Sequence, residues 1–203
     1  ATVHVWLTGQ HDTLLSLTAD SPRLQTFLAE ARSLNVPPSP DPVAFAEAVQ
    51  NAVVKELSAW SDPVDGVIVQ GDTASAYGAS LGARQVGFRV AHVEAGVRSG
   101  DSTSPWPEEG FRVMIDRVSR WRFAPTEWCH GNLEAEGLGL DTVVTGNTGI
   151  DDLMADDIRP VDLGTFRQVL ITLHRRETLA KLPDIADGLN WLAEQRPEAG
   201  VPL

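Results

Sequence analysis

The chain has 203 residues, 42% of them hydrophobic and 22% charged, a composition typical of a globular protein that buries a sizeable core. Its net charge of −12 argues against a nucleic-acid partner, because binding a phosphate backbone requires a basic face. No apolar run reaches the roughly 18 to 20 residues of a membrane span, no signal peptide is visible, and the single cysteine, Cys129, excludes an intrachain disulfide, so we expect a cytoplasmic protein without membrane contact.

Short β-forming runs alternate with helical patterns along the chain. Strands are expected at residues 3–8, 66–69, 88–93, 121–124, 142–145 and 169–172. Helices are expected at residues 21–31, 42–60, 74–86, 108–118, from 126 to near 137, and at 181–195. Strands that alternate with helices in this way are typical of βαβ units, so the sequence predicts an α/β fold with a parallel sheet.

Two segments resemble joints between these elements. The proline-rich residues 36–42 should be extended, because each proline disfavours the helical conformation of the residue before it. Residues 156–164 resemble an interdomain linker. We therefore divide the chain into an N-terminal domain, 1–158, and a segment, 159–203, that contains the linker and the start of a second α/β unit.

Acidic motifs follow two of the expected strands. Asp72 stands in Gly-Asp-Thr after the strand at 66–69, and Glu94 stands in His-Val-Glu-Ala-Gly after the strand at 88–93. A third motif, Pro-Trp-Pro-Glu-Glu, places Glu108 at the start of the next helix. Open parallel sheets bind ligands outside the carboxyl ends of their strands, so this placement indicates an active site.

Each motif also has a structural explanation. Asp72 could be a helix N-cap, and glutamates in a first helical turn are favoured by the helix dipole. His92 shares a strand face with Glu94 and could form half of a metal site, although few other metal ligands stand nearby. The cluster His-Arg-Arg-Glu that begins at His174 suits proton transfer or an anionic ligand, or simply a charged helix start.

Taken together and in this order, the motifs resemble those of the non-hydrolysing UDP-N-acetylglucosamine 2-epimerases. The resemblance covers residues 3 to about 195 and includes two further matching segments. The matching segments are 8–11 (Thr-Gly-Gln-His), 71–73 (Gly-Asp-Thr), 92–101 (His-Val-Glu-Ala-Gly-Val-Arg-Ser-Gly-Asp), 104–109 (Ser-Pro-Trp-Pro-Glu-Glu), 145–151 (Thr-Gly-Asn-Thr-Gly-Ile-Asp) and 174–177 (His-Arg-Arg-Glu).

The resemblance implies a GT-B-type architecture of two Rossmann-like domains with a nucleotide sugar between them, the second domain being largely missing from this chain. The implied enzyme is an isomerase that converts UDP-GlcNAc to UDP-ManNAc by eliminating UDP and adding it back to a 2-acetamidoglucal intermediate. Neither a cofactor nor a metal is expected. The partner is a UDP-sugar, and we expect the full-length protein to be a homodimer. Family members also carry an upstream Gly-Thr-Arg-Pro-Glu turn and a downstream Ser-Gly-Gly segment, so this chain is interpreted as a fragment that does not turn over alone.

The resemblance also assigns roles to individual residues. The acid/base candidates are Asp72, Glu94 and Glu108, while His174 would assist the departure and return of UDP. The candidate ligand contacts are Arg98, Arg112 and Arg175. Gln70 and Phe111 stand where the family usually has histidine and asparagine, which predicts an altered rate or substrate preference. The alternatives are an epimerase for another UDP-2-acetamido sugar, a non-catalytic UDP-sugar-binding module and, more distantly, a metal-dependent hydrolase.

Activation by a second UDP-GlcNAc molecule is expected to be weak or absent. Many bacterial members of the family use a Gln-His-x-x-Gln segment and a following arginine for this purpose. Here residues 10–13 read Gln-His-Asp-Thr, and residues 42–60 contain no arginine. We predict that conversion of UDP-ManNAc by the full-length protein proceeds without added UDP-GlcNAc, and a strict requirement for UDP-GlcNAc in that assay would contradict the prediction.

Overall fold

The computed structural model describes residues 2–10, 29–155, 171, 178 and 181–195. The chain divides into two compact units, Ala1–Ala155 and Asp156–Leu203. In the second unit, helix α9 (Leu182–Gln195) lies within one residue of the range predicted for it. The expected linker lies outside the described residues, and so does the expected strand at 169–172 except for Ile171, which has no regular secondary structure.

The first unit contains a parallel sheet with its strands in sequence order, which confirms the predicted α/β class. This sheet consists of β3 (Val67–Gln70), β4 (Val90–Val93), β5 (Trp121–Ala124) and β6 (Thr142–Val144). Parallel pairing places Val69 opposite His92 and His92 opposite Arg122. The carboxyl ends of β3 and β4 therefore meet at the same edge of the sheet.

A second, two-stranded parallel sheet pairs β1 (Trp6–Leu7) with β2 (Arg32–Ser33). The prediction of a strand at 3–8 was too long, because the pairing extends over only two residues. Strand β2 was not predicted, since a two-residue strand of arginine and serine has no apolar pattern. Of the predicted helix at 21–31, the described residues include helical Ala29 and Glu30.

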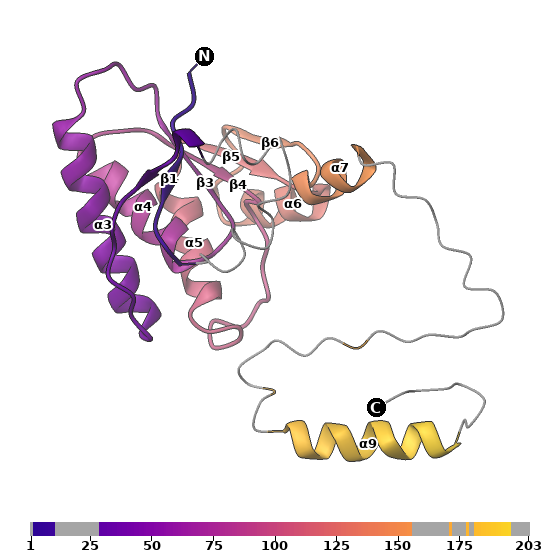
Figure 1. Cartoon of the computed structure of the whole chain (residues 1–203). Coiled ribbons are helices and arrows are strands. Elements are labelled where there is room, and N and C mark those ends of the chain that lie inside the picture. Colours follow the sequence, from indigo (N-terminus) through magenta and orange to yellow (C-terminus); the bar gives the residue numbers. More distant parts are fainter. Residues whose placement is uncertain (1, 11–28, 156–170, 172–177, 179–180, 196–203) are drawn as a thin grey trace. The chain divides into compact units, whose positions relative to one another are not determined.

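Helix α4 (Ala74–Gln85) lies between α3 (Pro42–Ala59) and α5 (Glu108–Val118), as Figure 1 shows. The two remaining helices of this unit are α6 (Glu127–Ala135), which was predicted, and α7 (Thr148–Ala155), which was not. The main core combines the apolar face of α3, including Val49 and Val53, with residues of α4, α5 and the first strands of the sheet. In the described residues no helix has the length and apolarity that crossing a membrane requires.

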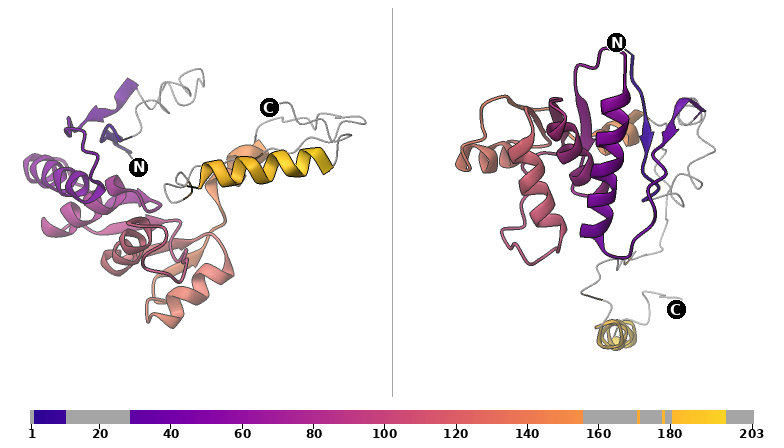
Figure 2. Two further views of the ribbon diagram at one scale, coloured as in Figure 1. Left: turned by 90° about the horizontal axis from the view of Figure 1, so that it is seen from below. Right: turned by 90° about the vertical axis from the view of Figure 1, so that its left-hand side faces the viewer.

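Two glycines allow α3 and α4 to approach closely, a packing that both views in Figure 2 display. A Cβ atom at Gly78 would lie 2.2 Å from the carbonyl oxygen of Ala46, and one at Gly82 would lie 2.8 Å from that of Gln50. Both glycines lie on one face of α4 because they are separated by four residues. Contact between the two helix backbones therefore depends on the absence of side chains at these positions.

Replacing Gly78 with alanine should lower the free energy of unfolding by about 1–3 kcal/mol, because the new methyl group overlaps backbone that cannot move without shifting α3. Gly131 of α6 is the matched control, since a Cβ there meets nothing within 4 Å. Its replacement by alanine should be neutral or stabilising by about 0.5–1 kcal/mol. Urea unfolding of both variants checks the prediction, and equal stability of the two would contradict it.

Candidate functional site

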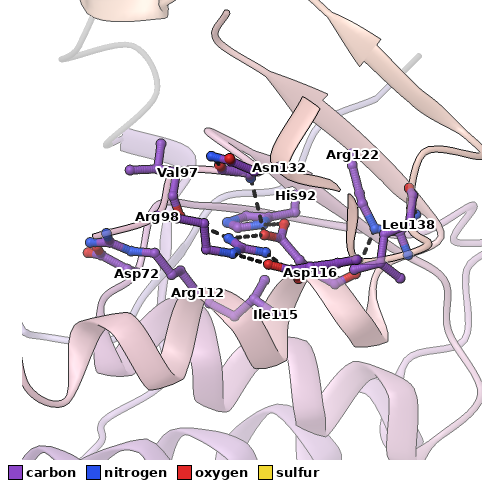
Figure 3. Close-up of polar contacts among 12 residues, drawn as sticks. Asp72, His92, Val97, Arg98, Arg112, Ile115, Asp116, Arg122, Asn132 and Leu138 are labelled. Carbon is purple, nitrogen blue, oxygen red and sulfur yellow. Dashed lines mark hydrogen bonds and ion pairs between the residues drawn. The ribbon is translucent and has the colours of Figure 1, made fainter. Parts of the chain in front are cut away.

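The candidate site lies where β3 and β4 end and α5 begins. Figure 3 shows that α5 provides the polar side chains that reach the two strand ends. Glu109, Arg112 and Asp116 are spaced by three and four residues and so share one face of this helix. Each of the three contacts a loop that follows a strand.

Asp72 follows β3 and is not the N-cap of α4. Thr73 is the cap, because its side chain accepts a hydrogen bond from the amide of Ala76 at 3.2 Å. Gln10 occupies another amide of the same turn, since its Oε1 accepts from the N–H of Ser75 at 2.9 Å. The capping explanation for Asp72 is therefore wrong, and its carboxylate forms an ion pair with Arg112 instead.

Glu94 follows β4 in an unusual backbone conformation. Its φ angle is 74°, in the left-handed region that side chains other than glycine rarely adopt, and such residues are concentrated at functional sites. The amides of Glu94 and Ala95 both donate to the carbonyl of Phe123, which holds this turn on β5. The carboxylate of Glu94 is partly buried beside Gly71 and makes no hydrogen bond or ion pair with any residue that the structure describes.

The two adjacent glutamates at the start of α5 have different environments. Glu109 is 4% exposed, and its carboxylate accepts hydrogen bonds from the amides of Ser99 and Gly100 and from Arg112. Glu108 is partly buried and has no polar partner among the described residues. Glu109 therefore anchors the loop after β4, and Glu108 has no such contact within the described part of the chain.

This difference predicts unequal effects on stability. Glu109→Gln should lower the free energy of unfolding by about 1.5–3 kcal/mol, because hydrogen bonds to a charged group are lost in a buried place. Glu108→Gln, one residue away, should change it by less than about 0.5 kcal/mol. Denaturant titration of both variants checks this, and a larger loss for Glu108→Gln would reverse the assignment.

Two of the three arginines predicted to contact a ligand, Arg98 and Arg112, are already paired with carboxylates. Arg98 uses four of its five N–H groups, on Val97, Asp116 and both carboxylate oxygens of Glu136. Burial lowers its pKa, but the hydrogen bonds to Glu136 and Asp116 outweigh burial, so the pKa is raised. Among the described residues, Arg112 uses two N–H groups, on Glu109 and Asp72, which leaves three. Of the two, Arg112 is therefore better suited to contact an anionic ligand.

A buried pair beneath the site was not predicted from the sequence. His92 and Asp116 are both fully buried, and His92 Nδ1 lies 2.6 Å from Asp116 Oδ1. His92 Nε2 lies 2.9 Å from the carbonyl oxygen of Gly71. Both ring nitrogens are thus engaged, which leaves neither for a metal, and the described residues contain no group of three or more potential metal ligands. The sequence signal that could have indicated this pair is the helical spacing of the polar residues on α5.

Further residues bound the site on other sides. Arg122 of β5 donates from Nε to the carbonyl of Asp116 at 2.7 Å, and burial lowers the pKa of Arg122.

Phe111 stacks on Tyr77 of α4 with ring centroids 4.5 Å apart, so its side chain packs between helices. Gln70 is exposed at the end of β3. The altered rate or preference expected from Phe111 and Gln70 stays a prediction. His174 and Arg175 lie outside the described residues.

Comparison with known proteins places these features in a family context. The family model for UDP-N-acetylglucosamine 2-epimerase matches residues 1–201. Among curated proteins, the UDP-N-acetylglucosamine 2-epimerase of Neisseria meningitidis is 40% identical over 64% of this chain and 41% of its own length. That of Bacillus subtilis is 35% identical over 88% of this chain and 47% of its own length.

Solved structures of such epimerases resemble this chain as well. The Neisseria meningitidis enzyme bound to UDP-GlcNAc superposes with a TM-score of 0.66 at 34% identity, covering 76% of this chain and 41% of the enzyme. The Methanocaldococcus jannaschii enzyme in complex with UDP-GlcNAc and UDP gives a TM-score of 0.70 at 31% identity, covering 81% of this chain and 48% of the enzyme. The chain therefore spans about half the length of the relatives it matches.

Proposed function

Because this chain belongs to the UDP-N-acetylglucosamine 2-epimerase family, we propose that the full-length protein reversibly converts UDP-GlcNAc to UDP-ManNAc. The observation that carries the proposal is the set of carboxylates at the ends of β3 and β4 and the start of α5. Glu94 and Glu108 have no polar partner in the described part of the chain, and Asp72 forms an ion pair with Arg112. A carboxylate without a partner is free to accept and return a proton.

The chemistry of epimerisation at C2 accounts for several carboxylates. No carbonyl adjoins C2 to acidify its hydrogen, so a base must remove the proton as UDP leaves from C1, giving a 2-acetamidoglucal. UDP then adds back while a proton is delivered to the opposite face of C2. Removal from one face and delivery to the other require proton carriers in different positions, and Asp72, Glu94 and Glu108 are the proposed carriers.

The nucleotide moiety requires cationic contacts. Arg112 retains three N–H groups and is the proposed contact for the diphosphate on this side of the site. Arg98 retains one, so we propose that it acts mainly by holding Asp116 and Glu136. The roles of His174 and Arg175, in UDP departure and ligand contact, stay predictions from the family resemblance.

The test uses the full-length gene product that contains this chain, incubated with UDP-GlcNAc in D2O and followed by NMR at C2. The expected result is deuterium at C2 together with formation of UDP-ManNAc. Absence of exchange at saturating UDP-GlcNAc would overturn the proposal. Light scattering of the same preparation should show a homodimer. Fractionation of cells that express the protein should place it in the cytoplasm.

A further inference from the structure

We propose that His92 is a positioning residue that, together with Asp116, fixes the two backbone turns carrying Asp72 and Glu94. This inference rests on the proposed function, since it assigns the pair a role in that reaction. The contacts are direct: His92 reaches the carbonyl of Gly71, which precedes Asp72, and Asp116 accepts from the amide of Gly96, two residues after Glu94, at 3.1 Å.

Gly71 and Gly96 each have both the backbone N–H and the backbone carbonyl in a hydrogen bond. Gly71 donates its N–H to the carbonyl of Val93 at 3.1 Å, and its own carbonyl accepts from His92. Gly96 donates to Asp116, and its carbonyl accepts from Asn132 Nδ2 at 2.9 Å. Both have positive φ angles, 69° and 80°. The turns next to the carboxylates are therefore held through their backbones by β4, α5 and α6.

The hydrogen bonds fix the orientation of the His92 ring. The carbonyl oxygen of Gly71 can only accept, so Nε2 carries a proton. The carboxylate of Asp116 also accepts from Gly96 and from Arg98, and although burial acts to raise its pKa, His92 and Arg98 outweigh burial and hold the pKa below its ordinary value. The ring of His92 is therefore held between two oxygen atoms that the turn after β3 and helix α5 fix in place.

The geometry explains why this ring suits the position. Its two nitrogens point in different directions from one side chain on β4, toward β3 on one side and toward α5 on the other. Catalytic groups displaced by about 1 Å lose much of their rate, so a buried, fully paired anchor at this point affects catalysis without touching the substrate. Figure 3 shows the ring beside Asp116, with Asp72 and Arg112 outside this pair.

Two substitutions separate the two contacts of the ring. The amide nitrogen of asparagine corresponds in position to Nδ1, so His92→Asn retains a donor toward Asp116 and loses the donor toward Gly71. The amide nitrogen of glutamine corresponds to Nε2, so His92→Gln retains the donor toward Gly71 and loses the donor toward Asp116. Both variants are neutral and similar in size.

In the full-length protein, His92→Asn should lower kcat at least about tenfold with KM within about twofold, because proton transfer is misaligned while ligand contacts remain. His92→Gln should recover most of the lost kcat, and the amide resonances of Asp72 and Thr73 should shift in His92→Asn but less in His92→Gln. Ser80→Ala is the control, because it removes a buried hydroxyl that donates to the Tyr77 carbonyl within α4, and it should leave kcat unchanged. Equal kcat for His92→Asn and the wild type would overturn the inference.

A measurement on the unaltered protein guards against variants that do not fold. The nitrogen NMR signals of His92 should show a proton on Nε2, the nitrogen that faces the Gly71 carbonyl, and a signal from an unprotonated Nε2 would also overturn the inference. Failure of the proposed function looks different. In that case the wild-type protein gives no deuterium exchange, while the ring signals and the Asp72 amide shifts still report on the anchor.

Discussion

Replacing Glu94 with glutamine in the full-length protein is expected to slow exchange of the substrate C2 proton by about two to four orders of magnitude, the contribution typical of a positioned acid or base. Glutamine keeps the shape of the side chain but cannot take up a proton. The left-handed backbone at this residue is imposed by the two amide hydrogen bonds to Phe123, so the substitution leaves the turn in place. The measurement is deuterium incorporation at C2 by NMR.

The matched control is Glu47→Gln on the exposed face of α3, which removes an equal charge away from the site. Its exchange rate should equal that of the wild type. Since Glu94 has no polar partner among the described residues, Glu94→Gln should also unfold at the same denaturant concentration as the wild type. An unchanged exchange rate in Glu94→Gln would remove Glu94 from the proposed proton carriers.

Local sequence patterns predicted much of the sheet because its strands are short apolar runs bounded by polar turns. Strand β4 is an example, since Val90, Ala91 and His92 are buried between β3 and β5. The sequence patterns did not predict strand β2 or helix α7, for two different reasons. The former is a pair of polar residues, and the latter begins with Thr148 and Gly149, which are typical of a turn rather than a helix start.

The carboxylates of the site were predictable because they follow strands, but their partners were not. Glu108 and Glu109 are adjacent, and only the packing of α5 determines that the second is buried against the loop at Ser99. His92 and Asp116 are separated by 24 residues, and their pairing depends on how α5 packs against β4. A side chain contact of this kind has no signature in a single sequence.

The same reasoning applies to Arg98, whose motif suggested a ligand contact. An arginine near a strand end suits an anion as well as it suits a carboxylate of the protein. The structure supplies two carboxylates, Asp116 and Glu136, at hydrogen-bonding distance. Whether an arginine is free for a ligand depends on these neighbours, which are brought close by α5 and by the residue following α6.

Removing the charge of Asp116 should destabilise the chain more than any other single change considered. This carboxylate is fully buried and accepts from His92, Arg98 and the Gly96 amide. Asp116→Asn removes a buried anion from the centre of this hydrogen-bond network and breaks its ion pair with Arg98, so the free energy of unfolding should fall by about 3–5 kcal/mol at pH 7. Asp152→Asn on the exposed surface of α7 is the control and should have no measurable effect.

The stabilisation that Asp116 contributes to the folded state should depend on pH. The folded-state pKa of Asp116 is depressed because His92 and Arg98 outweigh the opposing effect of burial. Its stabilisation is therefore fully present above the pKa of an unfolded aspartate, about 3.9, and is lost as the pH falls through the lower folded-state pKa. The difference in unfolding free energy between the wild type and Asp116→Asn should therefore narrow as the pH falls below about 4. A difference that does not narrow in this acid range would mean that Asp116 is not held as a carboxylate by His92 and Arg98.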